Sequence, residues 1–171
     1  FEVGHGMDTS VLESAGALEA DAAVVATNGD NTNLVIGQVL TKRYEIGTVV
    51  VRTEGDAAAV LAVDQTLVAH ADHWLVREIV LFMKRTLKRM DLTARSFFAL
   101  IEPGSCFAGS LFELALAADR SYMLDDPERP TAIALSGMNG GPLRMSNGLT
   151  RLETRFLGMP EQVGELLGEA E

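Results

Sequence analysis

LIEPGSCFAGSLFELALAADRSYML, residues 100–124, carries the clearest pattern of secondary structure in the chain. The run SFFALI at residues 96–101 leads into it, is rich in aromatic and branched side chains, and ends at Pro103-Gly104. This composition predicts a buried strand. Apolar residues then recur at helical spacing from Leu111 to Ala118, which predicts a helix with one face toward a core. The stretch therefore predicts a strand, a tight turn and a helix.

The turn between strand and helix is built from small residues, with Ala108, Gly109 and Ser110 next to the helix start. Small side chains let a ligand approach the backbone closely. The first N–H groups of a helix lack partners within the helix, and the helix dipole adds positive potential there. The sequence thus predicts a place suited to a developing negative charge.

The segment FAGSLFELALAAD resembles the signature of the crotonase (enoyl-CoA hydratase/isomerase) superfamily. With EPGSCFAG before it and SYML after it, the chain more closely resembles the benzoyl-CoA-dihydrodiol lyases, over about residues 53–158. The resemblance implies an incomplete crotonase-like (ββα) domain and ring cleavage of an aromatic acyl-CoA in benzoate degradation. The substrate would be acyl-CoA, with no cofactor required. Family members tend to assemble, so a homo-oligomer is also implied.

Three catalytic residues follow from this resemblance. Gly109 or Ser110 would donate a backbone N–H to the thioester oxyanion, and Glu113 would act as acid or base. The second donor loop is missing, and Gly137 stands where a second carboxylate is expected, so we expect negligible turnover. An alternative for Glu113 is a capping box with Ser110, which needs no catalytic role.

The resemblance also implies residues that border the substrate. Loop geometry alone is an alternative explanation for the glycine-rich part of this region, and Cys106 also suits a small buried residue. The candidates are Cys106, Phe107, Asn139, Ser146 and Asn147.

Residues 1–52 alternate between strand and helix patterns. The apolar runs at residues 22–27 (AAVVAT) and 48–51 (TVVV) read as strands, with a helix expected between them from residue 34 to residue 40. A short crossover of this kind predicts a parallel βαβ unit.

This segment resembles the second half of the Rossmann-like nucleotide-binding domain of TrkA-type potassium-transport regulators (the RCK domain). The resemblance implies binding of NAD(H) or adenine nucleotide, and a potassium transporter subunit as partner. The first βαβ unit with its G-x-G-x-x-G turn is absent, so the site would be incomplete. Ordinary turn chemistry is the alternative. The residues implied to face the nucleotide are His5, Gly6, Asp8, Thr27, Asn28, Gly29 and Asp30.

The fold class expected is α/β: a partial Rossmann-like segment over residues 1–52 joined to a partial crotonase-like segment over residues 53–171. No proline- or serine-rich linker separates them, which suggests a chimeric chain as a further hypothesis. A long helix is expected at residues 71–90 and a strand at residues 131–135. His70 and His73 have no well-spaced third ligand, so no metal site is expected.

The length, net charge and composition of the chain restrict the classes of function that it can have. The 171 residues carry a formal net charge of −10, which argues against nucleic acid and anionic membranes as partners. No apolar run reaches the roughly 20 residues of a membrane span, and no signal peptide is recognised, so we expect no membrane insertion. The single cysteine fits a reducing cytoplasm. The chain begins at Phe1, as expected of a fragment.

Overall fold

The computed structural model describes residues 5, 8–25, 35–36, 39–40, 43–93 and 96–168. Its centre is a four-stranded sheet in which the strands follow one another in chain order. All three pairings between neighbouring strands are parallel. The strands are β1 (Ala22–Val25), β2 (Thr48–Val51), β3 (Ser96–Ile101) and β4 (Arg120–Met123). The prediction of an α/β fold is confirmed.

The sheet crosses the boundary expected between the two segments. β1 and β2 lie within residues 1–52, whereas β3 and β4 lie beyond residue 53. β2 and β3 pair in register, with Thr48 opposite Ser96 and Val51 opposite Ala99. The two parts of the chain therefore share one hydrogen-bonded layer.

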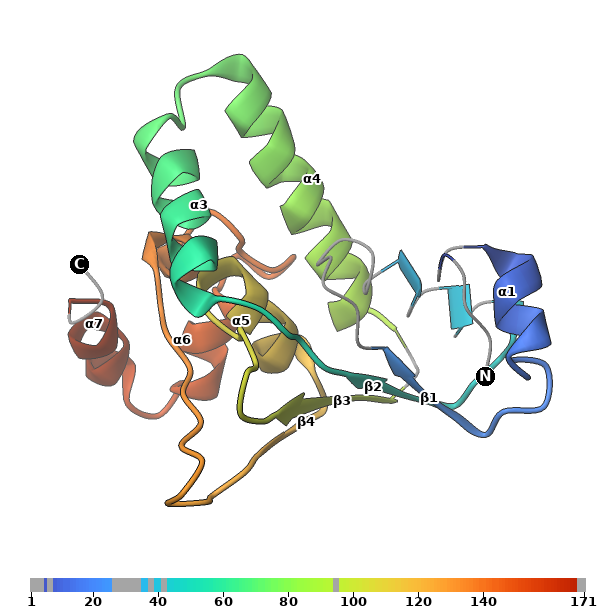
Figure 1. Ribbon diagram of the computed structural model, residues 1–171. Helices are drawn as coiled ribbons and strands as arrows, with labels where there is room; N and C mark the ends of the chain where they lie inside the picture. The colour runs from blue at the N-terminus through green and yellow to red at the C-terminus, as the bar shows by residue number, and fades with distance from the viewer. Residues whose placement is uncertain are drawn as a thin grey trace.

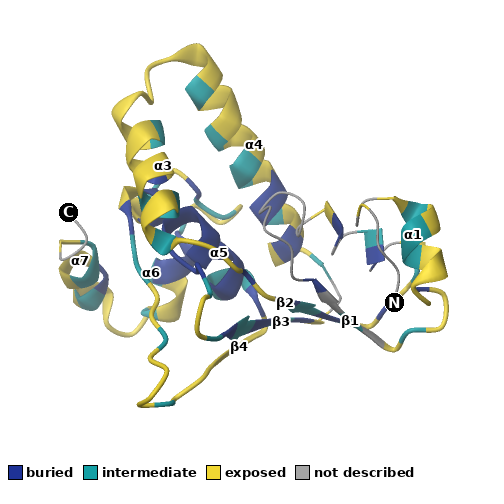
Figure 2. Cartoon of the chain, viewed as in Figure 1, coloured by how far each residue is buried: buried dark blue, intermediate teal, exposed yellow. Residues whose placement is uncertain are grey.

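Three helices lie on the same side of the sheet (Figure 1). They are α3 (Ala57–Ala69), α4 (Trp74–Asp91) and α5 (Gly109–Ala117). α3 and α4 form a hairpin that extends away from the sheet, and α5 lies at its base and contacts α3, α4 and β3. Figure 2 shows the far end of the hairpin exposed and α5 buried.

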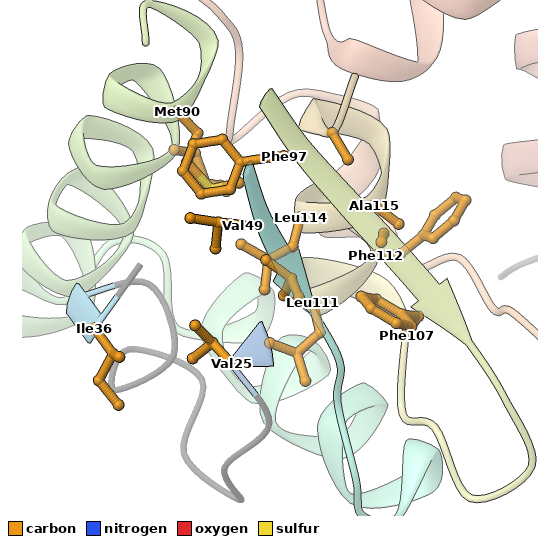
Figure 3. Packing of buried hydrophobic residues seen from close by; sticks show 14 of the residues in the cluster. Val25, Ile36, Val49, Met90, Phe97, Phe107, Leu111, Phe112, Leu114 and Ala115 are labelled. Carbon is orange, nitrogen blue, oxygen red and sulfur yellow. The ribbon is translucent and has the colours of Figure 1, made fainter. Parts of the chain in front are cut away.

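The core lies between this face of the sheet and α5. Burial alternates along β3, where Phe97, Ala99 and Ile101 point inward, as expected for a strand with one covered face. In α5, residues 109–115 are all buried. A helix of nine residues is too short to be stable alone, so packing around it supplies its stability. Figure 3 shows Leu111, Leu114 and Phe112 among side chains from the sheet and α4.

Shorter elements complete the structure. α1 (Thr9–Ser14) begins at Asp8, whose side chain accepts the Ser10 N–H. The 3-10 helix η1 (Gly137–Gly140) and α6 (Arg151–Arg155) contact α5, and α7 (Pro160–Gly168) packs against η1 and α6. α6 begins with a capping box between Thr150 and Glu153.

Two predicted elements differ from the structure. The long helix begins at Trp74 rather than residue 71, because the His73 side chain accepts the Leu75 N–H and caps it. The strand expected at residues 131–135 is reduced to an isolated bridge between Ala108 and Ala134. Within the described residues, no helix is long and apolar enough to cross a membrane.

Candidate functional site

Both predicted oxyanion donors make hydrogen bonds inside the protein. The Gly109 N–H donates to the carbonyl oxygen of Ala134 over 2.9 Å. The Ser110 N–H donates to Oδ2 of Asp64 over 2.6 Å. The place suited to negative charge at the start of α5 therefore holds a carboxylate of the chain itself.

Asp64 is a site residue that the sequence analysis did not find. It lies on α3 and is fully buried, with 0% of its surface exposed. Its Oδ2 also accepts the Ser136 hydroxyl over 2.6 Å. A Cβ at Gly109, where φ is +46°, would lie 1.9 Å from this oxygen, so only glycine allows the contact. The signal available in the sequence was a single charged residue in the run AVLAVDQTLVA.

Glu113 lies one turn further along α5 and is 1% exposed. Its Oε1 accepts from Nδ2 of Asn139 over 2.7 Å, and its Oε2 pairs with Nη1 of Arg151 at 2.8 Å. Burial raises the pKa of Glu113, whereas the bonds from Asn139 and Arg151 oppose the rise. The alternative of a capping box with Ser110 is wrong, because Ala108 is the N-cap of α5, without a side-chain cap, and Ser110 lies inside the helix.

Arg151 is the second buried charge that the sequence analysis missed. It is 2% exposed and makes two bonds to Asp91, from Nε to Oδ1 over 2.9 Å and from Nη2 to Oδ2 over 2.6 Å. The same guanidinium pairs with Glu113. The first residue of α6 therefore joins α5 to the end of α4 through a planar fork of donors.

Asn139 is buried, as a residue bordering a site would be. Besides Glu113, its Nδ2 donates to the Gly109 carbonyl over 2.9 Å, and its Oδ1 accepts the Ser136 N–H over 2.9 Å. These bonds fix η1 against the start of α5. Its role in substrate binding stays a prediction.

A cavity of about 810 Å³ lies between the hairpin and α5. Its wall is mostly apolar, and Ser110 stands where α5 begins, beside Leu111 and Leu114. Glu78 and Arg85 of α4 contribute charge. A space of this size and lining is typical of sites for small molecules with an apolar part. The hairpin contributes Ala59, Val60, Val63, Leu67, Ile79 and Phe82, among others.

The other predicted substrate contacts lie outside the lining of this cavity. Cys106 and Phe107 are buried in the core, and the Cys106 N–H donates to Oγ1 of Thr53 over 3.0 Å. Ser146 and Asn147 are exposed in a loop, where Oδ1 of Asn147 accepts the Leu149 N–H over 3.0 Å. Substrate contact by these residues stays a prediction.

Of the residues predicted to face a nucleotide, the structure describes His5 and Asp8. Both are exposed. Hydrogen bonds from the Ser10 hydroxyl and N–H lower the pKa of Asp8. Gly6, Thr27, Asn28, Gly29 and Asp30 lie outside the described residues, so the nucleotide site stays a prediction. Among the residues that are described, no group of three or more His, Cys, Asp or Glu side chains could hold a metal ion.

Comparisons with known proteins agree with both resemblances. The family model of the TrkA-N domain matches residues 2–73. Benzoyl-CoA-dihydrodiol lyase from Aromatoleum evansii is 53% identical over 116 residues, which make up 68% of this chain and 21% of the lyase. The chain thus spans about a fifth of the length of this curated relative.

The two matched stretches together exceed the length of the chain, so they overlap. The boundary at residue 53 therefore stays a prediction. The chain is related by sequence to the TrkA-N domain in its first part and, over about two thirds of its length, to benzoyl-CoA-dihydrodiol lyase.

Proposed function

We propose that this chain is an acyl-CoA-binding piece of a crotonase-type, ring-cleaving lyase, with little or no turnover of its own. The observation that carries the proposal is the cavity between α3, α4 and α5. Its wall includes Ser110, Leu111 and Leu114, which belong to the helix with the lyase signature. An apolar wall suits an aromatic acyl group, and Arg85 offers a cation for an anionic coenzyme.

Low turnover follows from how the catalytic candidates are bonded. The Ser110 N–H is held by Asp64, and both oxygens of Glu113 are held by Asn139 and Arg151. A thioester oxyanion would have to compete with Asp64 for the Ser110 N–H. It would also lack the second N–H donor that the chemistry needs. Removing a single donor from an oxyanion site costs roughly 100- to 1,000-fold in rate.

Titration with benzoyl-CoA, followed by calorimetry, tests the binding. A ligand that binds only the folded state raises the unfolding midpoint. Ala59 lines the cavity, whereas Ala62 of the same helix is exposed and lies outside its lining. We expect the indole of Ala59→Trp to occupy part of the cavity and reduce the shift, and Ala62→Trp to keep it. Equal shifts in both variants, or no shift in the unsubstituted chain, would contradict the proposal.

Turnover is measured separately with a dihydrodiol of benzoyl-CoA as substrate. We expect no consumption above the background rate. Consumption at an enzyme-like rate, abolished by Glu113→Gln, would show that the chain is an active lyase.

The TrkA-N match favours a second candidate, a regulatory module that binds NAD(H) or adenine nucleotide beside a potassium transporter. NADH fluorescence tests it. Under this candidate Asp8→Ala weakens binding, and Asp56→Ala is a matched control. Each of these aspartates caps a helix through one oxygen, so both variants lose a cap while only Asp8 belongs to the predicted nucleotide site. A cytoplasmic location and a homo-oligomer remain parts of the first proposal.

A further inference from the structure

We propose that two copies of this chain associate through α4, with the two helices antiparallel across a two-fold axis near Phe82. The inference names a surface for the homo-oligomer of the first proposal, and it rests on that part of the proposed function alone. It does not depend on acyl-CoA binding.

The surface is a row of five exposed residues along one side of α4, which we call the α4 seam. Leu75, Phe82 and Arg89 are seven residues apart, and Glu78 and Arg85 each follow three residues after one of them. This is the a and d spacing of a heptad, which keeps side chains on one side of a helix. The α4 seam can therefore contact a second helix along its whole length.

The apolar part of the α4 seam lies within a larger exposed patch. Leu75 is 47% exposed and Phe82 is 52% exposed. Trp74 and Ile79 of the same helix are 67% and 41% exposed. Figure 2 shows that this outer part of the hairpin is open to solvent. Apolar patches of this kind mark surfaces that bind other macromolecules.

The charges of the α4 seam select a second copy as the partner. Glu78 lies four residues before Phe82, and Arg85 lies three residues after it. In an antiparallel pair centred near Phe82, Glu78 of each copy therefore faces Arg85 of the other. Among the described residues neither Glu78 nor Arg85 forms an ion pair, so both charges are available. A surface complementary to itself is what a two-fold dimer requires, whereas a helix of one charge sign would place like charges together.

The same residues connect the dimer with the cavity. Glu78, Phe82 and Arg85 also line the space between α3, α4 and α5. A second α4 on the seam would therefore contact the wall of the cavity, and each copy would complete the site of the other.

Charge reversal tests the pairing, with sedimentation equilibrium as the measurement. The unsubstituted chain should form a dimer of twice its mass of 18.4 kDa. Glu78→Arg places arginines opposite each other, and Arg85→Glu does the same with glutamates. Each substitution should raise the dissociation constant of the dimer by about 10- to 100-fold, because like charges then face each other. Both positions are exposed, and circular dichroism checks that the variants are folded.

A mixture of the two single variants separates this pairing from any other effect of the substitutions. In a mixed dimer the arginines of one copy face the glutamates of the other, so the mixture should dimerise about as tightly as the unsubstituted chain. The double variant Glu78→Arg/Arg85→Glu should do the same. Arg77→Glu is the matched control, since it changes the charge as Arg85→Glu does but at an exposed residue outside the seam. It should leave the dimer intact.

The proposal is overturned if the unsubstituted chain stays a monomer up to its solubility limit, which would leave the α4 seam to a different partner. It is also overturned if a dimer forms that neither single substitution weakens, or if the mixture stays monomeric. A dimer that resists both substitutions would keep the homo-oligomer and reject only this surface. None of these samples contains benzoyl-CoA, so the result is distinct from a failure of the proposed acyl-CoA binding.

Discussion

Arg151 lies between two carboxylates in the interior, Glu113 on α5 and Asp91 at the end of α4. Each charge alone would be costly to bury, and the fork of the guanidinium serves both partners. The Asp91 side chain is 17% exposed, so solvent reaches this end of the cluster, whereas the described partners of the Glu113 carboxylate are the side chains of Asn139 and Arg151.

Glu113→Gln should change how stability depends on pH. The pKa of Glu113 is raised in the folded protein above its usual 4.5, chiefly by burial. Between 4.5 and that raised value the folded state binds more protons than the unfolded state, so stability falls as pH rises. Glutamine removes this contribution. In urea denaturation from pH 4.5 upward, the variant should gain stability relative to the unsubstituted chain as pH rises.

Glu153→Gln is the control with the opposite sign. Hydrogen bonds from Thr150 lower the pKa of Glu153, so its contribution is present above 4.5 and is lost as pH falls. The loss of stability caused by Glu153→Gln should therefore become smaller as the pH falls. Parallel pH profiles for the two variants would contradict our assignment of burial as the cause at Glu113.

At the residue scale, the sequence predicted that a helix starts near Gly109 and Ser110 and includes Glu113. The catalytic roles that the family resemblance implies for these residues stay predictions. Their partners could not be predicted, because Asp64 is 46 residues from Ser110 and Arg151 is 38 residues from Glu113. Only the packing of α3 and α6 against α5 brings them together.

α5 is the element on which the rest of the molecule packs. It contacts α3, α4, α6, η1, β3 and β4. Its first residue has to admit the Asp64 carboxylate, and its following residues have to fill the core. These two demands explain a glycine at the start followed by apolar residues.

Gly109→Ala should therefore destabilise the protein by about 2–4 kcal/mol, from overpacking and from a positive φ that non-glycine residues disfavour. Gly148→Ala is the matched control. Gly148 also has a positive φ, +88°, but its added Cβ would meet no atom within 4 Å, so only the backbone strain remains. Urea denaturation compares the two variants. Equal losses would show that the Asp64 contact does not explain the glycine at position 109.

Among the elements, local patterns predicted β2 and β3 with the bounds observed. The run at residues 131–135 was wrongly predicted as a strand. Its apolar residues are the signal that the prediction used, but only Ala134 pairs, through a bridge to Ala108. Pairing depends on which neighbour is available, and the sequence of the segment does not contain that information.

One parallel sheet holds together the two parts of the molecule that have different relatives. Val49 of β2 is fully buried, and it pairs in register with Phe97 of β3. The hypothesis of an inactive chimera whose two halves share only a core thus has a clear test in the cooperativity of unfolding.

We expect one transition in calorimetry, with equal calorimetric and van't Hoff enthalpies. Val49→Ala should shift the whole transition, with a loss of about 2 kcal/mol from the cavity created in the core. Val63→Ala, at a residue 58% exposed on the hairpin, should have little effect. Two transitions, of which Val49→Ala moves only one, would show that the halves fold independently.

α3 has two tasks at once: it forms one wall of the cavity and it carries Asp64 to the start of α5. A ligand that displaces α3 as it enters the cavity must also change the free energy of the Asp64–Ser110 contact. Occupation of the cavity and the strength of the Asp64–Ser110 contact are therefore linked through a single helix.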